Sequence, residues 1–77
     1  MNIRRVVGQN VRRYRLKAGL SQGELAAAMD VEQAYVSRLE AGTRNPTLVT
    51  VWHAAEALGV PPHKLLTPAS KPRIRKG

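Results

Sequence analysis

The sequence contains no cysteine and no phenylalanine, and its aromatic residues are one tryptophan and two tyrosines. The absence of cysteine excludes disulfide bonds, zinc sites with cysteine ligands and thiol catalysis. No apolar run is long enough for a membrane span or a signal peptide, so we expect a cytoplasmic protein. The two histidines have no E-x-x-H metal spacing, and no carboxylates are paired. We therefore expect no cofactor, no metal and no enzymatic activity.

Acidic residues are also scarce. Five Asp and Glu stand against thirteen Lys and Arg, which gives a formal net charge of +8. In so small a protein this charge favours a polyanionic partner. Nucleic acid is the first candidate, although charge alone leaves an anionic membrane surface or an acidic protein open. A chain of 77 residues forms one domain, so we expect no second catalytic or ligand-sensing domain and no small-molecule ligand.

Two short helices joined by a tight turn are predicted in the centre of the chain. Ser21 and Glu24 have the spacing of a capping box, in which each side chain satisfies a backbone N–H of the other residue. A helix should therefore begin at Gln22. Asp30 interrupts the apolar pattern, and a second helical run covers about residues 32–41.

The second helix of this pair has two chemically different faces. At about 100° per residue, one arc is largely apolar and consists of Tyr35, Val36 and Leu39. The opposite arc is small and polar, and consists of Gln33, Ala34, Ser37 and Arg38. An outward face of amide, hydroxyl and guanidinium groups on the second helix is what a helix-turn-helix needs in the major groove of DNA.

Three further helices complete an all-α, five-helix prediction. The first covers residues 3–18, with an apolar stripe formed by Ile3, Val7, Val11, Tyr14 and Ala18. A later helix begins after Thr47, and its inward stripe consists of Leu48, Val51, Ala54, Ala55 and Leu58. The last helix is short, begins at the Pro61-Pro62 pair and ends before Pro68.

Three features of this arrangement leave alternatives open. Gly8 is unfavourable inside a helix, and indicates either a neighbouring element that approaches closely or a loosely specified first turn. The apolar end of the helix that begins after Thr47, together with Trp52 and residues 60–66, either completes the core or forms a dimer contact. Residues 1–66 are predicted to form the DNA-binding domain, and residues 67–77 a disordered basic tail that adds sequence-independent affinity for DNA.

Most of the chain resembles the Cro/C1-type helix-turn-helix family of phage repressors and small bacterial regulators. The resemblance covers about residues 7–60, and includes the segments GLSQ, SRLEAG and RNPT. It implies a five-helix domain that acts as a two-fold dimer and inserts its third helix into the major groove.

The resemblance also implies roles for individual residues. Gln22 would anchor the start of its helix to a phosphate and brace the first residue of the recognition helix. Gln33 would read an adenine through its amide, and Ala34 would contact a thymine methyl group. Arg15 and Glu40 match the positions of a partly buried ion pair.

The remaining candidates lie later on the recognition helix and in the loop after it. Ser37 would contact a base or a phosphate, and Arg38 a guanine or the backbone, while Tyr35 belongs either to the core or to a phosphate contact. Arg44 and Asn45 would bind phosphates. Two positions depart from the family pattern, because Glu32 replaces a common helix cap and Ala41 replaces a frequent polar residue.

The predicted function is sequence-specific binding of double-stranded DNA, as a homodimeric repressor on an inverted-repeat operator with half-sites about 10 bp apart. The alternative from another class is a protein-interaction module with the same fold. Within the DNA-binding class, an antitoxin and a restriction-modification controller protein are the further candidates.

Overall fold

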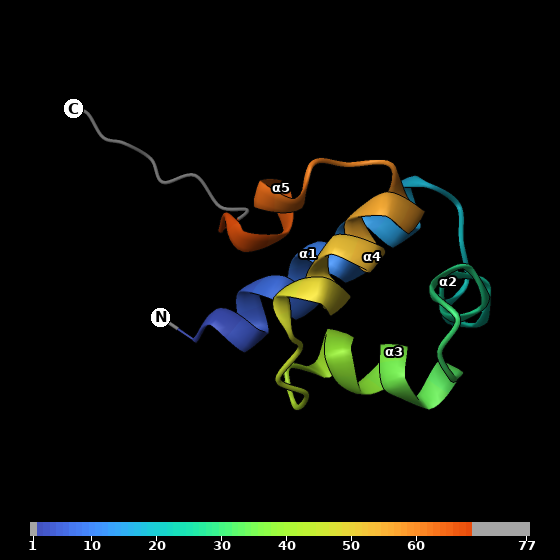
Figure 1. Ribbon diagram of the computed structural model, residues 1–77, viewed down its shortest axis with the longest axis horizontal. Coiled ribbons are helices and arrows are strands. Elements are labelled where there is room, and N and C mark those ends of the chain that lie inside the picture. Colours follow the sequence, from blue (N-terminus) through green and yellow to red (C-terminus); the bar gives the residue numbers. More distant parts are fainter. Residues whose placement is uncertain (1, 69–77) are drawn as a thin grey trace.

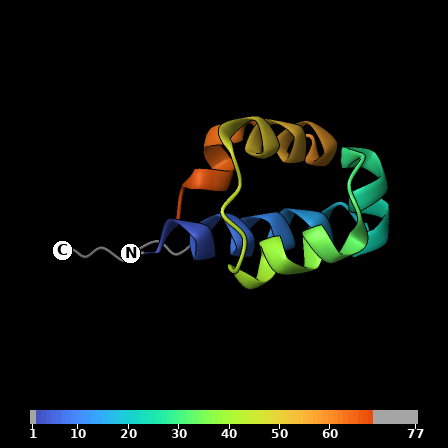
Figure 2. The same ribbon diagram turned by 60° about the horizontal axis from the view of Figure 1, so that its bottom comes forward.

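Five helices make up the regular structure of residues 2–68, which are the residues that the computed structural model describes. The helices are α1 (Ile3–Lys17), α2 (Gln22–Met29), α3 (Gln33–Ala41), α4 (Leu48–Leu58) and α5 (Pro62–Leu66). Helix α1 packs against α3, α4 and α5, and lies between α3 and α5 (Figures 1 and 2). The all-α, five-helix prediction is confirmed, and α1 ends one residue earlier than expected.

Local capping interactions set the helix boundaries. Ser21 Oγ accepts a hydrogen bond from the Glu24 N–H at 3.0 Å, and Glu24 Oε1 accepts one from the Ser21 N–H at 2.7 Å, which is the predicted capping box. Thr47 caps α4 in the same way, through its hydroxyl. Gly42 ends α3 at φ 79°, a left-handed conformation that glycine adopts without a steric penalty.

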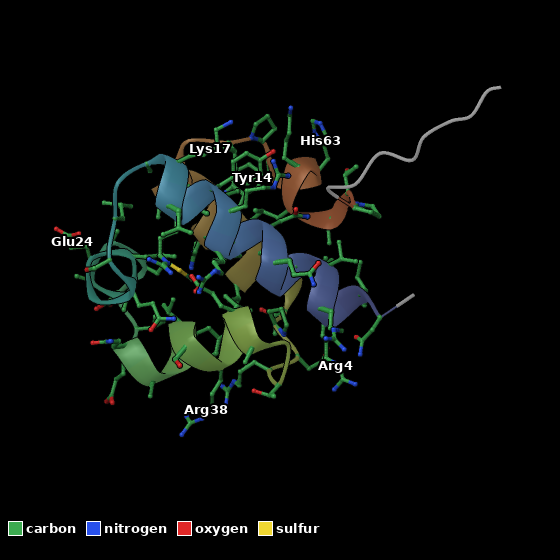
Figure 3. All side chains as sticks on the ribbon, turned by 180° about the vertical axis from the view of Figure 1, so that it is seen from behind. Arg4, Tyr14, Lys17, Glu24, Arg38 and His63 are labelled. Atoms are coloured by element: carbon green, nitrogen blue, oxygen red, sulfur yellow. The ribbon has the colours of Figure 1, made fainter. Side chains whose placement is uncertain are left out.

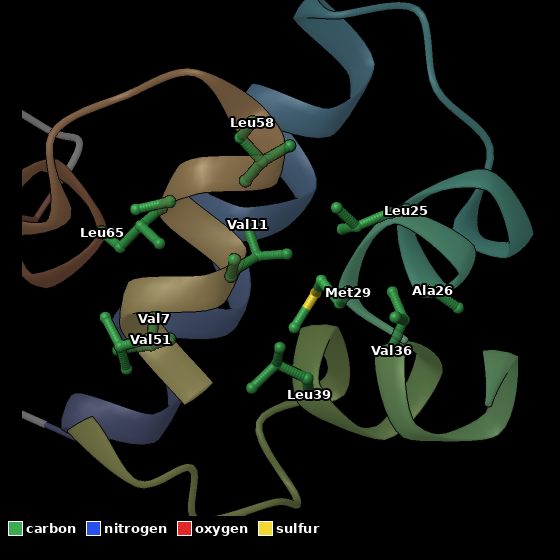
Figure 4. Close-up of a cluster of buried hydrophobic side chains, with 12 residues drawn as sticks. Val7, Val11, Leu25, Ala26, Met29, Val36, Leu39, Val51, Leu58 and Leu65 are labelled. Atoms are coloured by element: carbon green, nitrogen blue, oxygen red, sulfur yellow. The ribbon is translucent and has the colours of Figure 1, made fainter. Parts of the chain in front are cut away.

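A single apolar core fills the space between the helices (Figure 4). Its largest fully buried apolar side chains are Leu25, Leu39, Leu65, Val11 and Val36. Burial of each such side chain contributes roughly 1.5–3 kcal/mol. Because two of them belong to α3, the core fixes the rotation of that helix about its own axis and hence the direction of its opposite face.

The predicted apolar stripe of the first helix is correct in the middle and wrong at both ends, whereas that of α4 is wrong only at its first residue and correct from Val51 to Leu58. Leu48 is 81% exposed and Ile3 is 47% exposed, and Ala18 is also exposed. Leu48 lies at the edge of the buried arc of α4 and in its first turn, where no helix covers that edge. Trp52, for which the pattern left two possibilities, is 54% exposed and lies outside the core.

Gly8 marks the closest approach of α1 to α3. A Cβ atom at this position would lie against the Leu39 carbonyl oxygen and 2.8 Å from the Glu40 carbonyl oxygen. Both atoms belong to the backbone and cannot rotate away. Of the two interpretations of Gly8, close approach of a neighbouring element is correct.

The last helix is attached to α1 by one buried side chain. Asn10 is fully buried, and its Nδ2 donates to the Leu65 carbonyl at 2.9 Å and to the Thr67 carbonyl at 2.8 Å. Thr67, the first residue of the predicted tail, is thus held against the helical body. Residues 69–77 of that tail lie outside the described residues. Within residues 2–68, every helix is too short or too polar to cross a membrane.

Candidate nucleic-acid interface

The turn between α2 and α3 is closed by backbone hydrogen bonds. Asp30 adopts a left-handed conformation at φ 60°, and the Val31 N–H donates to the Ala26 carbonyl at 2.9 Å. Val31 then packs partly buried against the core. The chain thereby changes direction within three residues, and α3 leaves the turn across the axis of α2 (Figure 1).

Helix α3 exposes the predicted polar arc. Val36 and Leu39 are 0% and 1% exposed and lie in the core. The exposed residues on the other side of the helix are Gln33, Ala34, Ser37 and Arg38. Arg38 projects from α3 away from the remaining helices (Figure 3). The structure therefore brings together on one accessible face the four residues that the sequence placed there.

A buried ion pair fixes the position of α3 relative to α1. Arg15 Nε donates to Glu40 Oε2 at 2.6 Å and Arg15 Nη2 to Glu40 Oε1 at 3.1 Å, and both side chains are less than 10% exposed. The hydrogen bonds that Arg15 donates to the Glu40 carboxylate raise the pKa of Arg15 above its ordinary value, against the opposing effect of burial. The predicted pair between the first and third helices is confirmed.

Gln22 makes a different contact from the one expected. Its Nε2 donates to Glu40 Oε1 at 3.1 Å, so the Gln22 side chain contacts the ion pair of Arg15 and Glu40, whereas the expected partner was the first residue of α3. The Gln33 side chain instead reaches back over the first turn of α2. A Cβ atom on Gly23 would lie 3.4 Å from Gln33 Oε1, so this glycine leaves room for the base-reading candidate.

The loop after α3 carries further cations at the same edge of the molecule. The Arg44 guanidinium carbon lies 4.6 Å from the centre of the Tyr35 ring, a cation–π contact that holds both side chains beside α3. Tyr35 is half-buried, whereas Asn45 is exposed. Arg5, one of the basic residues of α1, lies close to this loop at Gly42.

These features are typical of a helix-turn-helix that binds DNA. They are a turn that holds two helices at a fixed angle, a second helix with one buried and one polar face, and positively charged side chains at the end of that helix. A helix-turn-helix family model matches residues 11–65 of the sequence. The chain belongs to the Cro/C1-type helix-turn-helix family. It is a DNA-binding transcriptional regulator.

Relatives within the family agree with this assignment. The chain is 44% identical over 71 residues to an uncharacterized helix-turn-helix transcriptional regulator, y4dJ, of Sinorhizobium fredii, covering 92% of each chain. It is 46% identical over 66 residues to the control protein C.BamHI of Bacillus amyloliquefaciens, covering 84% of this chain and 82% of that protein. The crystal structure of the restriction-modification controller protein C.AhdI from Aeromonas hydrophila superposes with a TM-score of 0.77 at 37% identity, over 80% of this chain and 90% of that one.

The two departures from the family pattern lie at opposite ends of α3. Glu32 is the N-cap residue, is exposed, and makes no side-chain capping hydrogen bond. Its carboxylate lies at the positive end of the helix dipole, where a negative charge is favourable. Ala41 is exposed directly before Gly42 and offers no polar group to DNA.

The histidines lie apart from this interface. His53 on α4 and His63 on α5 are both exposed, as the sequence suggested. Among residues 2–68, no three histidine, aspartate or glutamate side chains are grouped closely enough to hold a metal ion. Members of this family are DNA-binding regulators, and the face that carries the DNA-reading geometry is α3.

Proposed function

We propose that this regulator is a homodimeric repressor that binds an inverted-repeat operator with α3 of each subunit in the major groove. The observation that carries the proposal is the polar arc of α3, whose four exposed side chains are held outward by the buried Val36 and Leu39. A helix presented in this way fits the major groove. A repressor of this kind acts by occupying its operator.

Each residue of the arc has a distinct proposed role. The Gln33 amide can bond both N6 and N7 of an adenine, a contact worth about 1–3 kcal/mol of discrimination. Ala34 offers a methyl group to thymine. Ser37 and Arg38 lie one turn further along, where the hydroxyl can reach a base or phosphate and the guanidinium a guanine or the backbone.

The remaining contacts are proposed to position α3 on the duplex. Gln22 stands at the start of α2, where unpaired N–H groups and the helix dipole attract a phosphate. Arg44 and Asn45 approach the backbone from the loop, and the Tyr35 hydroxyl does so beneath Arg44. Such contacts fix the register and carry no direct sequence information.

The second subunit is proposed to pack on the outer face of α4. Trp52, Leu48 and Val49 are 54%, 81% and 62% exposed and lie within the first five residues of this helix. An exposed group of large apolar side chains is typical of an interface. We therefore prefer the α4 surface to residues 60–66 as the dimer contact. Of the two leucines in residues 60–66, Leu65 is buried in the core and Leu66 alone is exposed.

The biological role that we propose is control of restriction-modification genes. Two proteins similar to this chain are named as controllers of such systems or as control proteins, and one of them is 46% identical to it. An antitoxin role has no comparable support. The proposal predicts that the operator lies upstream of a gene pair for a methyltransferase and an endonuclease.

The experiment that tests the function is selection of bound sequences from random duplex DNA at physiological salt. We expect enrichment of an inverted repeat with half-sites about 10 bp apart. Gln33→Ala should lose preference at one base pair of each half-site, by about 1–3 kcal/mol, with little change in affinity for unselected DNA.

Ala41→Ser, a change at an exposed position of the same helix that lies outside the reading arc, serves as the matched control and should select the same repeat. Selection of no inverted repeat by the unmodified protein would contradict the proposal and favour a protein-interaction module.

A further inference from the structure

Within residues 2–68, two groups of basic residues lie on different sides of the molecule. One accompanies α3 and consists of Arg38, Arg44 and Arg5. Another lies across α1 and α5 and consists of Arg13, Lys17 and Lys64, with His63 beside them. Figure 3 shows Lys17 and His63 on one edge of the molecule and Arg38 on the opposite edge, with α1 between them. DNA in contact with α3 cannot touch the second group, because α1 separates the two.

Helix geometry explains why α1 contributes basic residues to both sides of the molecule. Arg5 and Arg12 lie about 20° apart on the helix circumference, next to Gly8 and α3. Arg13 and Lys17 lie about 40° apart and roughly 100° further round, next to α5. These four residues therefore form two separate stripes, and only the stripe of Arg5 and Arg12 follows the recognition helix.

The α5 side has a defined geometry, which we call the distal basic face and which consists of Arg13, Lys17, His63 and Lys64 around Tyr14. Arg13 Nη2 donates to Asn10 Oδ1 at 3.2 Å and to the Tyr14 hydroxyl at 3.4 Å. The Arg13 guanidinium carbon lies 4.5 Å, and Lys17 Nζ 6.0 Å, from the centre of the Tyr14 ring. These contacts hold two cations in place on one ring.

Asn10 also brings the two halves of this face together. The same buried amide that orients Arg13 binds the carbonyls of Leu65 and Thr67, and so fixes α5 beside α1. A groove of about 280 Å³ results between the helices, lined by Arg13, Tyr14, His63, Lys64, Thr67 and Pro68.

The cations of the distal basic face are not neutralised within residues 2–68. The ion pair of that part of the chain joins Arg15 to Glu40, on the other side of α1, and no carboxylate lies within 4 Å of Arg13, Lys17 or Lys64. The chain leaves the described part at Pro68, which lines the same groove. The nine residues that follow in the sequence include Lys71, Arg73, Arg75 and Lys76.

We propose that the distal basic face binds the phosphate backbone of a second DNA duplex while α3 holds the operator. Arg, Lys and a tyrosine hydroxyl are donors for phosphate oxygens, and no acceptor array for base edges faces outward there. A protein partner would require an apolar centre, which this face lacks, whereas interfaces with DNA are polar and positively charged. The regulator would thereby bridge two DNA segments without reading the sequence of the second.

A bridging assay with the full chain tests this proposal. The operator duplex is immobilised in slight excess over protein, so that every α3 is occupied, and a labelled duplex of unrelated sequence is then added. The unmodified protein should retain the labelled duplex. Lys17→Ala combined with Lys64→Ala should retain it about tenfold or more weakly at 0.1 M salt, and should flatten the slope of log K against log[salt] by about 1.8.

The matched control is Ala27→Glu combined with Ala28→Glu. Both alanines are exposed on α2, and the pair lowers the net charge by two, as the lysine pair does. This control should bridge as well as the unmodified protein. If it loses bridging to the same extent as the lysine variant, the effect is one of net charge and the proposal is wrong.

Two further results separate this proposal from the proposed operator function. The Lys17/Lys64 variant should keep unchanged affinity for the operator, whereas Gln33→Ala with Arg38→Ala should lose operator preference and still bind the unrelated duplex. Failure of the unmodified, operator-bound protein to retain a second duplex overturns the proposal. So does retention of a polyglutamate probe in place of DNA, which would identify an acidic protein as the partner.

Discussion

At the scale of single residues, Glu40 has more structural partners than any residue of the reading arc. Its carboxylate accepts hydrogen bonds from Arg15 on α1 and from Gln22 on α2, while its backbone carbonyl lies against Gly8. Arg15 also donates to the Leu20 carbonyl at 2.9 Å. One buried carboxylate thus connects the three helices that present the DNA-reading face.

Removal of one partner of this pair should destabilise the fold strongly. Arg15→Met leaves the Glu40 carboxylate buried without its cation, and should lower the free energy of unfolding by about 3–5 kcal/mol. Arg15→Met combined with Glu40→Leu removes both charges and should recover most of that loss. Urea denaturation measures both values, and equal stabilities of the single and double variants would contradict this account.

The exposed Arg12→Ala is the control, with an expected change within about 0.5 kcal/mol. The contribution of Arg15 should not vary with pH in the ordinary range. Its pKa is raised in the folded state, so the stabilisation linked to the proton on Arg15 is present below the ordinary pKa of arginine and is lost as the pH rises through the raised pKa.

At the scale of secondary-structure elements, the close packing of α1 on α3 requires a residue without a side chain at position 8. Gly8 lies in the interior of α1, where glycine costs roughly 1 kcal/mol relative to alanine. The structure explains why glycine occurs inside this helix: the α3 backbone occupies the space that a Cβ atom at Gly8 would need.

Gly8→Ala should therefore destabilise the protein despite its better helix propensity. The added methyl group forces α1 and α3 apart, with an expected loss of about 1–3 kcal/mol in the free energy of unfolding. Gly23→Ala in α2 is the matched control. Its nearest neighbour is the flexible end of Gln33, so this substitution should leave stability unchanged or increase it, by at most about 1 kcal/mol. Thermal unfolding followed by circular dichroism compares the two, and a stabilising Gly8→Ala would contradict the close packing.

At the scale of the whole molecule, the exposed face of α4 and the two basic sides divide the surface among three partners. In the proposed arrangement, α3 binds the operator, the distal basic face binds a second duplex, and α4 contacts the second subunit. Each assignment rests on a different chemistry: polar donors, uncompensated cations and exposed apolar side chains.

Trp52→Glu should convert the proposed dimer into a monomer. Burial of a charge in each copy of a two-fold interface is unfavourable, and the weakened dimer should lose most of its cooperative binding to a full operator while affinity for one half-site persists. Sedimentation measures the mass, and the emission of the single tryptophan should shift to longer wavelength when the unmodified dimer is diluted.

Leu16→Glu is the control, since Leu16 on α1 has the same 54% exposure as Trp52. A monomeric unmodified protein, or a dimer that survives Trp52→Glu, would exclude α4 as the interface.

Sequence patterns predicted the five helices, the capping box of α2, the Thr47 cap of α4 and the core arc of α3, and the family resemblance predicted the pairing of Arg15 with Glu40. The helices, their faces and the caps depend on residues close in the chain, so hydrophobic periodicity and local motifs predict them. The ion pair depends on the family pattern. The exposure of Gln33, Ser37 and Arg38 followed from the same periodicity. The proposed contacts of these residues with DNA remain predictions.

Other features were decided only by tertiary structure. Whether Leu48 and Trp52 face the core or the solvent depends on which neighbour covers the end of α4, and helical spacing does not contain that information. Three other features likewise depend on elements that are distant in sequence. They are the contact between Gln22 and Glu40, the close approach of α3 to Gly8, and the neighbour that each basic stripe of α1 receives. The sequence alone determined which faces each helix has, and packing in three dimensions decided which of those faces remained open to a partner.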